Sequence, residues 1–281
     1  MKVYVEPPAH LSQAMFRVSR ALASYAPAGV EIVKDPQQAE FHVLHVIAND
    51  AIAYAAARPE LKFAVIQYCY KTAGEGPWHQ LWKRASAVWS YYYLKTPNLY
   101  LSPLGIDPEF TKMPLAHGPR RAVLTTGYVA GPGAEAIEEV VTAATHLGVE
   151  AIHLGPQPVG LVHAPPMNWV TLHGITDEAL AKVYQSCAWV SGLRHVEGFE
   201  MPCIEGLACG ARPIVFDRSD MRRWYQGHAI FVPECSGVEL TERLMHILSH
   251  PPRPVDKTER EVVLSRFYWE TIIKGFWERA L

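Results

Sequence analysis

Short apolar runs alternate with segments of helical periodicity along most of the chain. Near the start, apolar side chains recur at the three- and four-residue spacing of one helix face, namely Leu11, Met15, Val18 and Leu22. Apolar runs of four to eight residues between turn residues are typical of buried strands. In the first hundred residues the pattern therefore predicts strands at 2–5, 41–47, 63–67, 87–90 and 99–101, and helices at 11–25, 49–57 and 77–85.

The rest of the chain repeats this alternation more clearly. Strands are predicted at 121–127, 150–155, 169–174, 187–192, 212–217 and 229–232, and helices at 134–147, 177–186, 202–209 and 237–249. Strands separated by helices imply right-handed crossovers and a parallel sheet. A turn-rich segment at 102–108 divides the two halves, so we expect two Rossmann-like domains, at 1–104 and 105–265, facing a cleft.

Composition narrows the class of protein. The 281 residues are 49% hydrophobic and 19% charged, and the net charge is −2. The chain therefore lacks the basic excess of most nucleic-acid-binding proteins, although a local basic patch is compatible with this net charge. The chain has no apolar run of membrane-spanning length and no signal peptide, and its five cysteines are an odd number without Cys-x-x-Cys spacing. These features predict a cytoplasmic protein with free thiols.

The stretch from Arg194 to Val215 carries the most specific chemistry. Gly198 lets the backbone approach a ligand closely, and the amides around Phe199, Glu200 and Met201 precede or open a helix, where unpaired N–H groups attract a diphosphate. We expect Pro202 to be the first helical residue.

Two glutamates flank this turn. Glu205 is predicted in the first turn of the helix, where its oxygens suit a ribose diol, and Glu197 could accept from hydroxyls of a sugar. The alternative is a strand–turn–helix with two solvated glutamates.

The string EGFEMPCIEGLACGARPIVF, at 197–216, resembles the pattern EGFGLPxxEAMACGxPVV of retaining glycosyltransferase family four. The segments 173–184, 102–110 and 267–270 resemble further parts of that family. The resemblance implies the GT-B fold, with a nucleotide-sugar-binding C-terminal domain and an acceptor-side N-terminal domain onto which residues 266–281 pack back.

The resemblance also implies roles for individual residues. Glu205 would bind the donor ribose and Glu197 the donor sugar, while Gly198, Phe199, Glu200, Met201 and Pro202 would line the sugar and diphosphate. The nucleotide base would lie against His173, Gly174 and Ile175. The expected reaction moves a hexose from a UDP-glucose-like donor to a hydroxyl with retention, without metal or cofactor, and the sequence has no Asp-x-Asp motif.

The chain departs from the family where a diphosphate needs cations. The family supplies an Arg and a Lys after the first strand of its second domain, but residues 125–133 contain neither. Backbone amides of the glycine-rich loop at Gly127 and Tyr128 could replace part of that positive charge. Arg194 is the candidate catalytic cation, and the alternative is that it is a solvated loop arginine. A non-catalytic nucleotide-sugar-binding module or assembly subunit therefore stays open. An NAD-dependent enzyme is disfavoured because residues 127–133 lack G-x-G-x-x-G spacing.

The acceptor side has weaker signals. His10, His45, Tyr68 and Lys71 are candidates near predicted strand ends. Trp78 begins an aromatic and basic segment that ends at Tyr93, which is either core or an acceptor surface. The acceptor could be a glycan, a lipid, a small molecule or a nucleic acid with a hydroxymethylated base. The sequence specifies neither the acceptor nor the oligomeric state.

Overall fold

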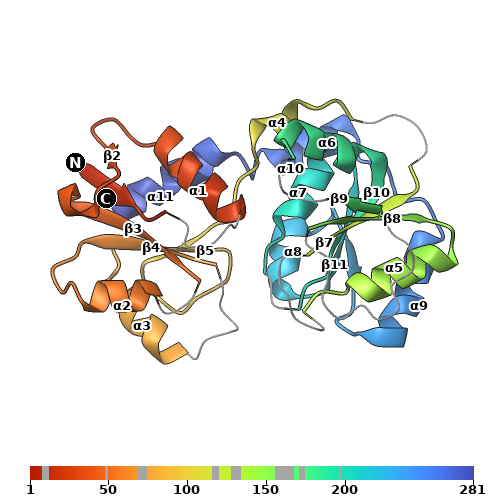
Figure 1. Ribbon diagram of the computed structural model, residues 1–281, viewed down its shortest axis with the longest axis horizontal. Helices are drawn as coiled ribbons and strands as arrows, with labels where there is room; N and C mark the ends of the chain where they lie inside the picture. Colours follow the sequence, from red (N-terminus) through yellow and green to blue (C-terminus); the bar gives the residue numbers. More distant parts are fainter. Residues whose placement is uncertain are drawn as a thin grey trace. The chain divides into compact units, whose positions relative to one another are not determined.

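The computed structural model describes residues 1–7, 13–47, 50–68, 75–115, 120–127, 134–155, 168–170, 175–195 and 198–281. The chain forms two compact units (Figure 1). The N-terminal unit comprises Met1–Gly105 and Phe267–Leu281, and the C-terminal unit comprises Ile106–Arg266. Each unit contains its own six-stranded sheet, so the protein belongs to the predicted α/β class.

The sheet of the N-terminal unit is parallel throughout, in the order β2-β1-β3-β4-β5-β6. Its strands are β1 (Lys2–Val5), β2 (Glu31–Val33), β3 (Phe41–Val46), β4 (Phe63–Gln67), β5 (Val88–Ser90) and β6 (Leu99–Leu101). The five strands predicted here are confirmed. The sequence pattern did not predict β2, because three residues are too few to show a periodicity.

Four of the described helices cover this sheet, and the exposed 3₁₀ helix η1 (Pro36–Gln38) connects β2 to β3. The helices α1 (Gln13–Ser24) and α11 (Trp269–Ala280) lie on one face, and α2 (Asp50–Ala56) and α3 (Glu75–Arg84) lie on the other (Figure 1). Helix α3 begins two residues before the predicted start at Pro77. Pro77 is thus the third helical residue, where its missing N–H still removes no intrahelical hydrogen bond.

Most of the aromatic segment that begins at Trp78 belongs to the core of the N-terminal unit. Trp78, Trp82 and Trp89 are each at most 1% exposed. Trp82 Nε1 donates to Gln67 Oε1 (3.0 Å), and Trp89 Nε1 donates to the Ser102 carbonyl (3.1 Å). Of the aromatic residues from Trp78 to Tyr93, only Tyr93, at 64% exposed, is a large exposed side chain. The core alternative is therefore correct for most of this segment.

The C-terminal unit has a second parallel sheet, in the order β12-β11-β10-β7-β8-β9. Its strands are β7 (Ala122–Thr126), β8 (Glu150–Leu154), β9 (Asn168–Val170), β10 (Cys187–Gly192), β11 (Arg212–Phe216) and β12 (Ile230–Val232). The chain runs outward from β7 through β8 to β9 and then returns to the other side of β7 with β10. The topological switch point therefore lies at the carboxyl ends of β7 and β10.

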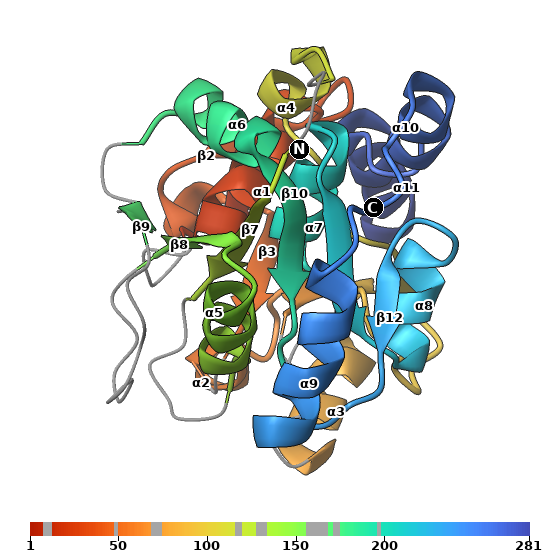
Figure 2. The same ribbon diagram turned by 90° about the vertical axis from the view of Figure 1, so that its right-hand side faces the viewer.

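Helices cover both faces of this sheet (Figure 2). On one face, α5 (Ile137–His146) packs against α9 (Gly237–Leu248) over a core that includes Val140, Trp189 and Leu244. On the other face lie α6 (Asp177–Ser186), which Thr176 caps as predicted, and α7 (Met201–Ala208). The remaining helices are α4 (Pro108–Lys112), α8 (Ser219–Tyr225) and α10 (Lys257–Leu264).

Helix α7 is buried along its whole length between the sheet and other helices. Gly206 makes this packing possible, because a Cβ there would lie 2.5 Å from Val190 Cγ2 on β10. The helix ends before Gly210, whose φ of 97° lets the chain turn into β11. The predicted strand–turn–helix–strand order of this segment is confirmed.

No described helix combines the length and apolar character needed to cross a membrane. The cysteines in the described ranges are free; Cys187, Cys203 and Cys209 are buried and Cys235 is partly so. Burial raises the pKa of the Cys187 and Cys209 thiols to about 12, so both stay protonated at neutral pH.

Candidate functional site

The segments that follow β7 and β10 are joined at the switch point of the C-terminal unit. The Ala136 amide donates to the Leu193 carbonyl (3.0 Å), and the His195 amide donates to the Ala134 carbonyl (3.1 Å). Glu135 and Arg194 thereby form an isolated antiparallel bridge. The backbone is thus fixed at the place where ligands of open parallel sheets bind.

Arg194 lies at the centre of a buried polar cluster and is only 7% exposed. Its Nε contacts Glu135 Oε1 (2.7 Å), its Nη1 donates to Glu200 Oε2 (2.8 Å), and its Nη2 donates to Thr126 Oγ1 (2.7 Å). We call Arg194, Glu135, Glu200 and Thr126 the Arg194 cluster. The alternative of a solvated loop arginine is wrong, because the guanidinium is buried between two carboxylates.

Glu200 is the N-cap residue of α7 and is 1% exposed. Its amide donates to the Tyr225 hydroxyl (2.9 Å), which in turn donates to the Glu200 carbonyl (2.7 Å). The Tyr225 ring also stacks on Phe199, with ring centroids 5.9 Å apart. Tyr225 comes from α8, a helix missing from the sequence prediction, and it fixes the backbone immediately before α7.

Helix α7 begins at Met201, one residue earlier than predicted. Pro202 is therefore the second helical residue, and Glu205 lies in the second turn rather than the first. The helix dipole consequently contributes little to the Glu205 carboxylate, because its effect is confined to the first turn.

A hydrogen bond orients this carboxylate instead. Glu205 is 3% exposed, and its Oε2 accepts from the Tyr184 hydroxyl (2.7 Å). Tyr184 comes from α6 and packs edge-on against Phe110, with ring centroids 5.9 Å apart. The alternative of a solvated Glu205 is therefore wrong.

Because Gly127 has no side chain, the side chains of Glu135 and His153 can pack against it at the end of β7. A Cβ on Gly127 would lie 2.9 Å from Glu135 Oε2 and 3.0 Å from His153 Cε1. The His153 ring is fully buried, and its Nδ1 is hydrogen-bonded to Thr125 Oγ1 (2.9 Å). The Gly127 amide donates to the Leu154 carbonyl (3.2 Å), so that N–H already has a partner within the sheet.

Several predicted site residues lie outside the described residues: Glu197, Tyr128, His173, Gly174, His10 and Lys71. Gly198, Phe199, Glu200 and Met201 are buried at the start of α7, and Ile175 is half-buried directly before α6. The structure therefore brings the predicted residues 198–205 together with Arg194 and Gly127 in one unit.

Sequence reasoning missed the partners that hold these groups, namely Glu135, Thr126, Tyr184 and Tyr225. A glutamate just after a glycine-rich loop was the available signal for Glu135. A single sequence holds no comparable signal for the two tyrosines.

The predicted acceptor residues His45, Tyr68 and Trp78 lie inside the N-terminal unit. His45 Nδ1 is hydrogen-bonded to the Tyr68 hydroxyl (2.8 Å) and Nε2 to Ser19 Oγ (3.0 Å). Burial lowers the pKa of His45 to about 4 and raises that of Tyr68 well above its usual value. These three residues are at most 7% exposed and pack in the interior of the N-terminal unit, and their role on the acceptor side stays a prediction.

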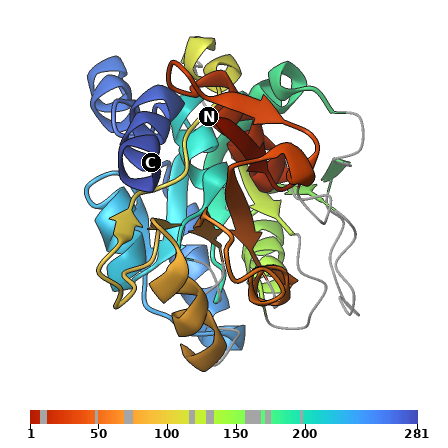
Figure 3. The same cartoon turned by 90° about the vertical axis from the view of Figure 1, so that its left-hand side faces the viewer.

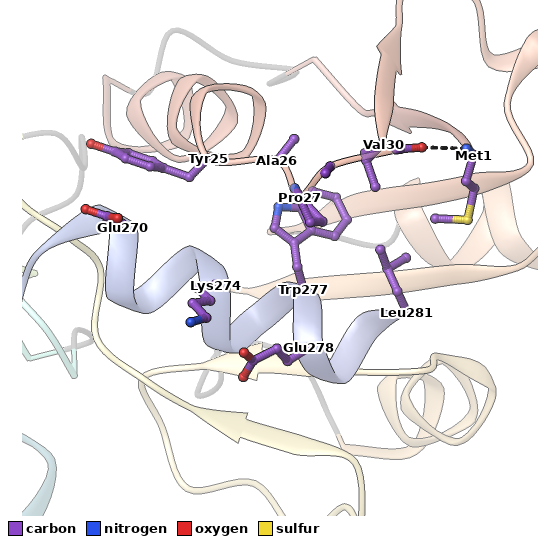
Figure 4. A pocket seen from close by; sticks show the side chains of 12 residues that line it. Met1, Tyr25, Ala26, Pro27, Val30, Glu270, Lys274, Trp277, Glu278 and Leu281 are labelled. Atoms are coloured by element: carbon purple, nitrogen blue, oxygen red, sulfur yellow. Dashed lines mark hydrogen bonds between the residues drawn. The ribbon is translucent and has the colours of Figure 1, made fainter.

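The N-terminal unit also has a pocket of about 700 Å³ between α11 and the loop before β2 (Figure 4). Pro27 and Trp277 line it, as do the two chain termini, Met1 and Leu281, which lie near each other (Figure 3). Met1 and Val30 precede β1 and β2, so this pocket lies at the amino ends of those strands. Ligands of open parallel sheets bind at the carboxyl ends of the strands, so this pocket does not have the position typical of a ligand site in such a sheet.

Sequence comparison and structural comparison give different results. No protein-family model matches the chain, and no curated protein matches its sequence. Solved structures match it over nearly its whole length. Sucrose-phosphate synthase from Thermosynechococcus elongatus superposes with a TM-score of 0.73 at 14% identity, covering 99% of this chain and 97% of that one.

Two further solved structures match equally broadly. HepE from Anabaena, in complex with UDP, has a TM-score of 0.71 at 10% identity, covering 99% of this chain and 98% of its own. A glycosyltransferase from Rickettsia africae has a TM-score of 0.67 at 10% identity, covering 99% of this chain and 97% of its own. At these identities the likeness concerns the fold, and the chain has the GT-B fold that the sequence predicted.

Proposed function

We propose that the protein is a glycosyltransferase that moves a hexose from a nucleotide sugar, with UDP-glucose as the leading donor, to a hydroxyl acceptor. The observation that carries this proposal is the start of α7 at the switch point, with buried Glu205 on the helix and glycine before it. Support also comes from the GT-B fold and from HepE, whose structure was solved with UDP-glucose.

The chain's own groups have defined tasks in this proposal. The Glu205 carboxylate, held by the Tyr184 hydroxyl at 2.7 Å, accepts hydrogen bonds from the donor ribose. Backbone groups of Gly198, Phe199 and Met201 line the sugar and diphosphate, and Glu197 accepts from hydroxyls of the transferred sugar. Stabilising the charge that develops on the leaving diphosphate lowers the barrier to transfer.

The finer features of the reaction follow the family resemblance. We expect retention of anomeric configuration, no metal ion, and a cytoplasmic location. The acceptor is a glycan, a lipid, a small molecule or a modified nucleic acid. His45, Tyr68 and Trp78 lie in the interior, so they do not help to choose among these four classes.

One observation favours a second candidate, a non-catalytic nucleotide-sugar-binding module. Arg194 already faces two carboxylates, and residues 125–133 contribute no Lys or Arg to a diphosphate. A module of this kind would bind UDP-glucose and never turn it over. Measured release of UDP and glucose from UDP-glucose, or transfer to any acceptor, separates the two candidates.

Glu205→Ala is expected to weaken UDP binding about 100-fold, because charge-assisted hydrogen bonds to the ribose are lost. The measurement is titration calorimetry with UDP, together with hydrolysis of UDP-glucose. Tyr184→Phe is the matched control: it removes the partner of Glu205 but keeps the carboxylate, so UDP affinity should stay within about threefold. Unchanged UDP affinity in Glu205→Ala would refute the role of Glu205 and weaken the proposed function.

A further inference from the structure

The chain that leaves β10 is held by Arg218, the N-cap residue of α8. Arg218 Nη1 donates to the His195 carbonyl (2.7 Å), and Nη2 donates to the Arg194 carbonyl (2.8 Å). The Arg218 side chain is only 11% exposed, and its Nη1 also lies 3.5 Å from Glu234 Oε1. One planar guanidinium therefore fixes two successive peptide groups beyond the carboxyl end of β10.

The other end of the same connection is held by Tyr225, the last residue of α8. The Tyr225 hydroxyl accepts from the Glu200 amide (2.9 Å) and donates to the Glu200 carbonyl (2.7 Å). Arg218 and Tyr225 thus fix the backbone on both sides of residues 196–199. Helix α8 and its N-cap residue therefore determine where the connection from β10 to α7 begins and where it ends.

Arg218 is itself held in place by the sheet. The Asp217 amide donates to the Val232 carbonyl (2.7 Å), which joins the residue before Arg218 to β12. The centre of the Phe216 ring, at the end of β11, lies 4.6 Å from that of the His195 ring and 6.0 Å from Arg218 Cζ. The position of the guanidinium is therefore set by the fold before any ligand binds, which lowers the ordering cost of binding.

We infer that Arg218 is a positioning residue for the sugar and diphosphate of the donor. It acts through the carbonyls of residues 194 and 195: with these fixed, the backbone of Gly198 and Phe199 is presented to the ligand in one conformation. The nucleoside is bound by Glu205, which is held from α6, so nucleoside binding does not depend on Arg218. This inference rests on the proposed function, because it takes the sugar and diphosphate to lie along Gly198 and Phe199.

Arg218→Met tests the inference, because methionine keeps an apolar stem of similar length and removes both hydrogen bonds to the backbone. In ligand-observed magnetic resonance titrations of the full chain, affinity for UDP-glucose and UDP should fall about tenfold, as the binding-competent conformation falls to about one tenth of the population. Uridine affinity should stay within about twofold, whereas a merely structural role would leave all three affinities unchanged or lower them together. Arg218→Lys, the milder change, should show the same selective loss, because a flexible ammonium does not reproduce the planar fork of the guanidinium.

Arg222→Met is the matched control, because it removes the same charge from the same helix. Arg222 bonds Asp217 (2.7 Å) and Gln226 (3.0 Å), both outside residues 194–201, so UDP affinity should stay within about twofold.

Four results would overturn the inference and leave the proposed function intact: wild-type UDP affinity in Arg218→Met, an equal loss of uridine affinity, an equal loss in Arg222→Met, or full rescue in Arg218→Lys. The last would show that the charge of Arg218, rather than its grip on two carbonyls, affects binding. A wild-type protein that binds neither UDP-glucose nor UDP would overturn the proposed function, and the inference with it.

Discussion

Arg194→Met is expected to lower the free energy of unfolding of the C-terminal unit by about 3–5 kcal/mol, because it leaves two buried carboxylates without their cation. Glu135 and Glu200 lie within 2.8 Å of the guanidinium, and Arg194 also bonds Thr126 at the end of β7. The loss is a large part of the total stability of an ordinary domain. Urea denaturation, followed by the fluorescence of Trp189 and the other tryptophans, measures it.

The matched variant combines Arg194→Met with Glu135→Gln and Glu200→Gln. Removing all three charges should recover most of the lost stability, since neutral groups cost far less to bury than unpaired ions. An Arg194→Met protein that loses less than about 1 kcal/mol would show that the cluster is solvated, and would contradict its description as a buried ion-pair cluster.

Acid is expected to destabilise the N-terminal unit through His45. Burial lowers the pKa of His45 from 6.5 to about 4, so the unfolded chain binds more protons than the folded protein between those pH values. The histidine costs no stability above pH 6.5, and its penalty grows as the pH falls to about 4. From pH 7 to pH 4 this single residue should remove about 3 kcal/mol of unfolding free energy.

The measurement compares unfolding free energies of the wild-type protein and His45→Gln across that range. Between pH 7 and pH 4 the wild-type protein should lose about 3 kcal/mol more unfolding free energy than His45→Gln loses. Tyr68→Phe removes a hydrogen bond to His45 (2.8 Å) and keeps its burial, so it should retain the wild-type pH dependence. Parallel pH profiles for wild type and His45→Gln would disprove the claim that His45 causes this acid destabilisation.

The periodicity of the sequence predicted most of the larger elements, whereas α11 was anticipated only by the family resemblance, as part of the segment 266–281. Buried parallel strands such as β4 and β10 are continuous apolar runs, and the Thr176 cap marked the start of α6. The missed helices α4 and α8 are short, so tertiary packing rather than periodicity determines them. Helix α10 had a usable signal in Asp256 and Glu259, since Asp256 Oδ1 accepts from the Glu259 amide (2.7 Å).

The candidate site was only partly predictable. The string around Glu205 identified the helix and the glycine turn, because the type and order of these residues are local properties. The contacts of Arg194 with Glu135 and Thr126 depend on β7 and β10 being neighbours in the sheet, which no local pattern encodes. The tryptophans near Trp78 were ambiguous because a core and a stacking surface have the same composition.

Hydrogen exchange with and without saturating UDP tests the central claim, that a nucleoside diphosphate binds at the start of α7. The account predicts slower amide exchange in residues 198–208 and near the end of β7, with no change around Trp277 and the pocket beside α11. Protection confined to that pocket, or no protection anywhere while UDP is bound, would contradict it.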